Sequence, residues 1–171
     1  MRKTHLLGMV LIFLLFSPSR IHAQDEMFKA LFMYNFTKEI GWPDSYKSGN
    51  FIIGILGSNP ITQELEKIAQ KKKVGKQAIS VVEFQNVNSI TKCHILFIPS
   101  NRTNDFYAAS EKLKNNHTAI LTDRPGYARK GAAINYVKID GKQKFEINTK
   151  TLADRGLNYT TFLTSLGIVV E

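Results

Sequence analysis

Hydrophobic positions in this chain gather into short continuous runs separated by amphipathic stretches. The clearest run, 93–99, is almost wholly apolar, is too brief for a free-standing helix and ends at a proline that cannot continue a hydrogen-bond ladder. A strand that is apolar on both faces needs cover on both faces. This is typical of a central strand in a mostly parallel α/β sheet. The runs 51–56, 78–84 and 119–122 predict further strands.

Between these runs, apolar residues recur at helical spacing. Asn59 is suited to cap a helix that begins near Pro60 and continues to about residue 70. A second helix is expected over 103–115, and two shorter ones over 149–155 and 160–169. The last helix is expected to dock through five apolar residues: Phe162, Leu163, Leu166, Ile168 and Val169.

The pattern changes to strict alternation over 133–139 and 144–147, on either side of a turn at 140–143. Alternation predicts a β-hairpin with one buried face, so we expect antiparallel strands at one edge of the sheet. The predicted fold class is therefore α/β, with a mostly parallel central sheet, an antiparallel edge hairpin and helices on both faces.

The segment 25–40 reads as a helix that is apolar nearly all round. Spacings of three and four predict one core face, and the remaining apolar residues form a second face. The core face would hold Phe28, Leu31, Phe32, Phe36 and Ile40, and the second face Met27, Ala30, Met33 and Tyr34. A helix of this kind is either sandwiched or offers its second face to a partner. We expect a dimer or partner surface at Met27, Met33 and Tyr34, because thioethers beside an aromatic ring repack easily.

The start of the chain has the features of an export signal. Arg2 and Lys3 precede an apolar stretch over 6–16, and the small residue Ala23 is suited to cleavage. We expect a cleaved signal peptide over 1–23, a single domain over 24–171 and a location outside the cytoplasm. Removing the three basic residues of that segment leaves 20 basic against 14 acidic residues, a net charge of about +6. Such a charge suits acidic protein faces, acidic polymers or anionic lipid, and nucleic acid is not an expected partner in that compartment.

Side chains suited to catalysis or metal binding do not converge in the sequence. Cys93, the single cysteine, is expected to be a buried core thiol, and His94 a hydrogen-bonded strand-end histidine. Neighbours on a strand point to opposite faces, so these two cannot form a nucleophile–base pair. Asp123 and Glu146 are expected in exposed salt bridges and not as an acid–base pair. No enzyme activity, metal or cofactor is expected.

Binding residues are the stronger candidates. Arg124, Pro125 and Tyr127 follow a strand at its carboxyl end, where open α/β sheets commonly place ligands, although a plain turn is an equal alternative. The single tryptophan, Trp42, lies beside Pro43 at the end of the first helix. Tryptophan is common both in cores and as an interface anchor, so Trp42 stays a candidate for either role.

Taken in order, the segments 30–36, 41–43, 51–57, 93–98, 131–136, 144–148 and 153–157 resemble the YfiR/HmsC-like family of exported bacterial proteins. The resemblance implies a periplasmic regulator that docks on the outer domain of an inner-membrane signalling protein, typically a diguanylate cyclase that makes cyclic-di-GMP, and holds it inactive. It also implies a homodimer. Some relatives carry cysteine pairs that confer redox sensitivity, and the lone Cys93 departs from that pattern. The family also occurs beside membrane histidine kinases, so the target stays open.

Two classes of function follow. The first is a non-enzymatic regulator that binds a diguanylate cyclase or a sensor kinase. The alternative is a periplasmic small-molecule carrier or sensor, with the loop at Arg124 as an anion clamp. A hydrolase would need a converging set of acid, base and nucleophile that the sequence does not offer.

Overall fold

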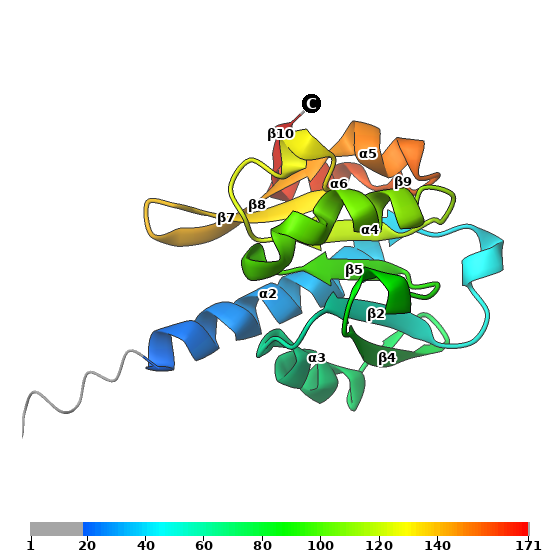
Figure 1. Cartoon of the computed structure of the whole chain (residues 1–171), viewed down its shortest axis with the longest axis horizontal. Helices are drawn as coiled ribbons and strands as arrows, with labels where there is room; N and C mark the ends of the chain where they lie inside the picture. The colour runs from blue at the N-terminus through cyan, green and yellow to red at the C-terminus, as the bar shows by residue number, and fades with distance from the viewer. Residues whose placement is uncertain (1–18, 171) are drawn as a thin grey trace, which may run out of the picture.

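The computed structural model of the protein describes residues 19–170. Its centre is an eight-stranded sheet in the order β10-β8-β7-β6-β5-β2-β4-β3 (Figure 1). The predicted central strand is β5, which lies between β2 and β6 and pairs with both in parallel. The parallel strands are β4 (Gln77–Phe84), β2 (Phe51–Leu56), β5 (Ile95–Ile98), β6 (Ala119–Thr122) and β7 (Ile134–Ile139).

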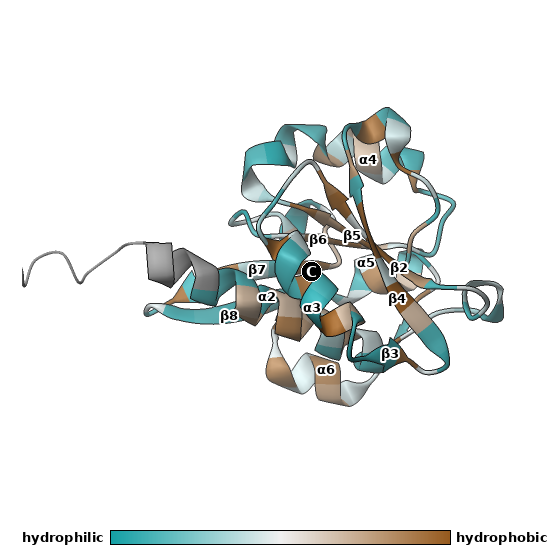
Figure 2. Cartoon of the chain, turned by 90° about the horizontal axis from the view of Figure 1, so that it is seen from below, coloured by the Kyte–Doolittle hydropathy of each residue, from teal (hydrophilic) through white to brown (hydrophobic). Residues whose placement is uncertain are grey.

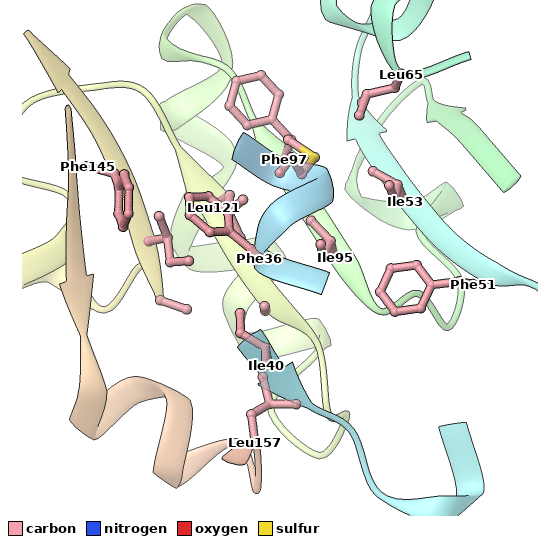
Figure 3. Packing of buried hydrophobic residues seen from close by; sticks show 14 of the residues in the cluster. Phe36, Ile40, Phe51, Ile53, Leu65, Ile95, Phe97, Leu121, Phe145 and Leu157 are labelled. Atoms are coloured by element: carbon pink, nitrogen blue, oxygen red, sulfur yellow. The ribbon is translucent and has the colours of Figure 1, made fainter. Parts of the chain in front are cut away.

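Helices cover both faces of this sheet, which confirms the predicted fold class. Ile95 and Phe97 of β5 face the side that carries α2 (Ser19–Glu39), α3 (Ile61–Ala69) and α6 (Thr161–Leu166). Leu96 and Ile98 face the side of α4 (Phe106–Lys112). All four residues of β5 are buried, as a two-sided apolar strand requires. Figure 3 shows the first of these two layers, with Phe36 of α2 lying between Phe145 and the central strands.

Side-chain caps begin several helices at the predicted places. The Asn59 side chain accepts the backbone N–H of Ile61 at 3.0 Å, at the start of α3. The Asn148 side chain caps α5 (Thr149–Asp154) by accepting the N–H of Thr151, and the Thr160 hydroxyl caps α6 in the same way. Short 3₁₀ segments connect other elements: η2 (Asp44–Tyr46), η3 (Val87–Ser89), η4 (Ser100–Asp105) and η5 (Ala128–Lys130).

The two edges of the sheet differ from the prediction. The hairpin of β7 and β8 (Lys142–Asn148) is antiparallel as expected, but it is not the edge. The chain after α6 forms β10 (Ile168–Val170), which pairs in parallel with β8. At the opposite edge β3 (Lys73–Val74) pairs antiparallel with β4.

The last predicted helix is therefore too long. It ends at Leu166 because Gly167 is extended and passes close to the β8 side chains. A Cβ at Gly167 would lie 2.6 Å from both Phe145 and Ile147, so only glycine lets the chain turn into β10 there. Of the five residues expected to dock, only Leu163 is fully buried, and Phe162, Leu166, Ile168 and Val169 are exposed.

The helix α2 runs along one face of the sheet and projects beyond it beside the β7–β8 hairpin (Figure 2). It begins at Ser19, before the predicted start at Asp25. Residues 1–18 lie outside the described residues, so the signal peptide over 1–23 stays a prediction. After α2, β1 (Ile40–Gly41) pairs with β9 (Asn158–Tyr159) in a separate two-stranded sheet.

The buried face of α2 is rotated from the predicted one. Ala30, Met33, Phe36 and Ile40 are in the core, whereas Phe28 and Leu31 are exposed. The expectation that Met33 belongs to a partner surface is wrong, because its side chain is fully buried against the sheet. The more general prediction, a helix with a second apolar face, is confirmed.

Candidate functional site

The solvent-exposed side of α2 carries a group of large apolar side chains. Met27, Phe28 and Leu31 are 44, 41 and 44% exposed, and they lie near the middle of α2, which begins at Ser19. The later residues of the same face, Asn35 and Lys38, are polar. Three large apolar side chains on adjoining turns cost free energy in water, so this surface is a candidate contact site. We call it the α2 face.

A groove of about 390 Å³ runs between the α2 face and α3. Its apolar lining comes from Met27, Leu31 and Tyr34 of α2 and from Ile68 of α3. The structure thus places two predicted surface residues, Met27 and Tyr34, at one groove. The hydroxyl of Tyr34 also reaches the carbonyl of Lys73 at 3.5 Å.

The rim of this groove is positively charged. Its charged residues are Lys38, Lys67, Lys71, Lys72 and Glu64. The single carboxylate, Glu64, pairs with Lys67 at 2.7 Å, which leaves an excess of three positive charges. These lysines come from α2, from α3 and from the turn that follows α3, which meet only in the folded chain. An apolar floor with a basic rim suits an acidic, amphipathic protein segment.

A second apolar surface lies at the sheet edge that ends in β10. Phe162 and Leu166 of α6 and Ile168 and Val169 of β10 are all exposed. An edge strand with apolar side chains is a natural site for association, because its outward backbone groups can pair with another strand. We call this surface the β10 edge.

In the loop expected to clamp an anion, the Arg124 side chain already has partners within the protein. The Nη1 of Arg124 donates to the Thr103 hydroxyl at 2.8 Å, and the guanidinium lies 6.0 Å from the Tyr127 ring. Tyr127 is buried and packs edge-on against Phe106, whereas Pro125 is exposed. These contacts favour the plain-turn alternative for the loop.

Asp123, just before that loop, has a structural role, and the expectation that it is exposed is wrong. Its carboxylate contacts Lys29 Nζ at 2.6 Å and accepts the backbone N–H of Ser100 at 2.6 Å. Burial alone would lower the pKa of Lys29, but Asp123 and Glu26 together raise it above its ordinary value. Glu146 accepts a hydrogen bond from the Asn135 amide at 2.9 Å, not the expected salt bridge.

His94 and Cys93 are core residues, as predicted. The Nδ1 of His94 accepts the backbone N–H of Ile52 at 3.0 Å, so the proton lies on Nε2, which donates to the carbonyl of Tyr46 at 2.7 Å. Its ring stacks on Phe51 with centroids 4.2 Å apart. Cys93 is fully buried, and burial raises the pKa of its thiol to about 12. Neither side chain is available as a nucleophile or base.

Acid is expected to destabilise the protein through His94. Burial, with a smaller contribution from Lys92, lowers the pKa of His94 despite the hydrogen bond to Tyr46. Below pH 6.5 the His94 side chain is protonated in the unfolded chain but still neutral in the folded one. The free energy of unfolding therefore decreases as the pH is lowered, until the pKa of His94 in the folded protein is reached. The slope from this group approaches about 1.4 kcal/mol per pH unit. Urea unfolding at several pH values between 7.5 and 5 measures this dependence. The free energy of unfolding of His94→Gln should change less with pH than that of the wild type, and an equal pH dependence would contradict this account.

Trp42 proves to be a core residue, 7% exposed, packed edge-on against Phe51 with ring centroids 4.9 Å apart. Its indole Nε1 is buried and has no hydrogen-bond partner among the described residues. Within residues 19–170, no group of three or more His, Cys, Asp or Glu side chains is placed to hold a metal ion. No helix in that range is long and apolar enough to cross a membrane.

The sequence model of the YfiR/HmsC-like family matches residues 26–167, which is most of the chain and covers both the α2 face and the central sheet. The chain belongs to the YfiR/HmsC-like family. Membership points to a periplasmic regulator of diguanylate cyclase systems. No curated protein matches the sequence.

Proposed function

We propose that this protein is an exported regulator that docks on the extracytoplasmic domain of an inner-membrane signalling protein, a diguanylate cyclase or a sensor kinase, and holds it inactive. The observation that carries the proposal is the α2 face in a member of the YfiR/HmsC-like family. Met27, Phe28 and Leu31 supply apolar anchors, and the lysine rim beside them supplies charge complementarity to an acidic partner.

Repression of this kind needs no catalytic group. A regulator acts by binding the inactive state of its target more tightly than the active state. A preference of about 1.4 kcal/mol shifts that equilibrium tenfold, and a few buried apolar side chains can supply it. Opposite charges across the contact would mainly speed association and fix the orientation of the partner.

The substitution Leu31→Asp is expected to release the target. It places a negative charge in an apolar groove and repels an acidic partner, so affinity should fall about 30-fold or more. The measurement is cellular cyclic-di-GMP, or kinase output, in a native host that lacks the gene and is complemented with each variant. Wild-type protein should restore the repressed level, and Leu31→Asp should not.

The matched control is Tyr107→Asp. Tyr107 is 61% exposed on α4, which lies on the opposite face of the sheet. This variant should repress like the wild type, and thermal unfolding of both purified variants would show that they fold. Full repression by Leu31→Asp would show that the α2 face is not the docking surface. Unchanged output on deletion of the gene would remove the proposal itself.

We also infer that two copies associate through the β10 edge. Four exposed apolar side chains lie there, away from the charged groove. Pairing of two β10 strands would cover them and the free backbone groups of the edge. Light scattering on the purified protein should give twice the chain mass, and the monomer mass at all micromolar concentrations would contradict the inference.

A further inference from the structure

A hollow of about 360 Å³ lies where α2 ends, at the amino ends of β2 and β4. Ile40, Trp42 and Phe51 form much of its apolar wall, and Val74 of β3 adds to it. The hollow is thus at the end of the sheet opposite to the Arg124 loop, which follows the carboxyl end of β6. Its volume is near the lower end of the range for small-molecule sites, about 300–1,000 Å³.

The walls of this hollow are held in place by contacts behind them. Phe51 contacts both the Trp42 ring and the His94 ring, and the centroids of those two rings are themselves 5.9 Å apart, so the three rings form one packed cluster. The Gln77 side-chain amide donates to the carbonyls of Tyr46 at 3.0 Å and Gly49 at 3.2 Å, which ties down the loop after η2. A site built this way is preformed, so a ligand would lose little affinity to ordering of the protein.

The charges around the hollow are of one sign. Lys47 and Lys76 both line it, and no acidic side chain does. Asp44 pairs with Lys47 at 2.8 Å, but both side chains are largely exposed, so that pair is weak and leaves Lys47 free to turn to a ligand.

We propose that this hollow, which we call the Trp42 pocket, binds a small organic acid whose body is one ring or a short alkyl chain. The apolar body would lie against Trp42 and Phe51, and the carboxylate would lie at the rim between Lys47 and Lys76. Inorganic anions do not fit this lining, because they would bring a hydration shell against apolar walls. The site is independent of the docking function proposed above.

Trp42 is the only tryptophan, so its fluorescence reports directly on the pocket. Titration of the purified protein with phenylacetate or hexanoate at low salt should give a saturable change with a Kd of about 1 mM, a typical affinity for so few atoms. The neutral isosteres phenylacetamide and hexanamide should bind about three- to tenfold more weakly, because they lose the charge interaction at a solvated rim.

Two variants separate the charge from the hollow. Lys47→Ala/Lys76→Ala should lower the affinity for the acid to that for the amide, whereas Lys142→Ala/Lys144→Ala on β8, with the same change in net charge, should leave it unchanged. Val74→Trp fills the hollow from the short edge strand and should abolish binding of both the acid and the amide. Because this variant has a second tryptophan, its ligand binding is measured by the thermal shift of unfolding and not by fluorescence. The proposal is overturned if neither acid saturates, if acid and amide bind equally, or if Val74→Trp binds like the wild type.

Discussion

Replacing Phe36 by alanine is expected to lower the free energy of unfolding by about 3–5 kcal/mol. The Phe36 ring is almost fully buried and lies edge-on to Phe145 with centroids 4.8 Å apart. It also lies 6.1 Å from the Tyr136 ring, so its loss would leave a cavity between α2 and the sheet. The surrounding rings are held by the sheet and would collapse only in part.

The matched substitution is Phe28→Ala on the same helix. Phe28 is 41% exposed and has one ring neighbour, Phe32, at 4.8 Å. We expect it to cost about 1 kcal/mol or less, since much of the side chain is already in water. Urea unfolding followed by circular dichroism measures both. Equal losses for the two variants would mean that the two faces of α2 are assigned wrongly.

This pair of residues shows what the sequence could not decide. Both fall on one side of an ideal helix, and the residues on the other side are apolar as well. Periodicity therefore predicts the helix but not its orientation about its axis. Contacts distant in sequence decide it: Tyr136 donates to the carbonyl of Lys29 at 2.8 Å, and Phe145 packs against Phe32 and Phe36.

The sheet was more predictable, because its central strands are buried on both faces and therefore appear as uninterrupted apolar runs. The runs at 51–56, 93–99 and 119–122 contain the neighbouring parallel strands β2, β5 and β6. Residues 168 and 169, which belong to β10, were read as the end of a helix, because an apolar helical pattern precedes them and so short a strand carries no period of its own. What defines β10 is its pairing with β8, which no local pattern records.

The candidate sites, too, were predictable only as far as they depend on residues that are close together in the sequence. The expected apolar surface on the first helix exists, but its rim comes from α3 and the following turn. The Arg124 loop was chosen from the usual position of ligand sites in open sheets, and it lacks an open clamp because Thr103 supplies a partner from another crossover. The sequence left Trp42 open between core and interface, and the hollow beside it depends on how the β3–β4 turn meets the end of α2.

Replacing Lys29 by methionine is expected to cost about 3–5 kcal/mol of stability. The side chains of Lys29 and Asp123 are only 11 and 13% exposed, and that of Glu26, which also pairs with Lys29, is 17% exposed, so removal of the cation leaves two carboxylates in a poorly solvated place. The matched control, Lys150→Met, breaks the exposed pair with Asp154 and should cost less than about 1 kcal/mol.

The double variant Lys29→Met/Asp123→Asn decides what the ion pair contributes. If the cost of Lys29→Met is mainly the stranded Asp123 carboxylate, neutralising Asp123 as well should restore much of the lost stability, less the part due to Glu26, and urea unfolding would give the double variant a higher free energy of unfolding than Lys29→Met. A double variant as unstable as the sum of the two single variants would instead mean that each side chain acts through separate contacts. Coupling is the expected result, because this pair fastens the projecting part of α2 to the carboxyl end of β6. That fastening holds Phe28 and Leu31 in the orientation in which a partner would meet them.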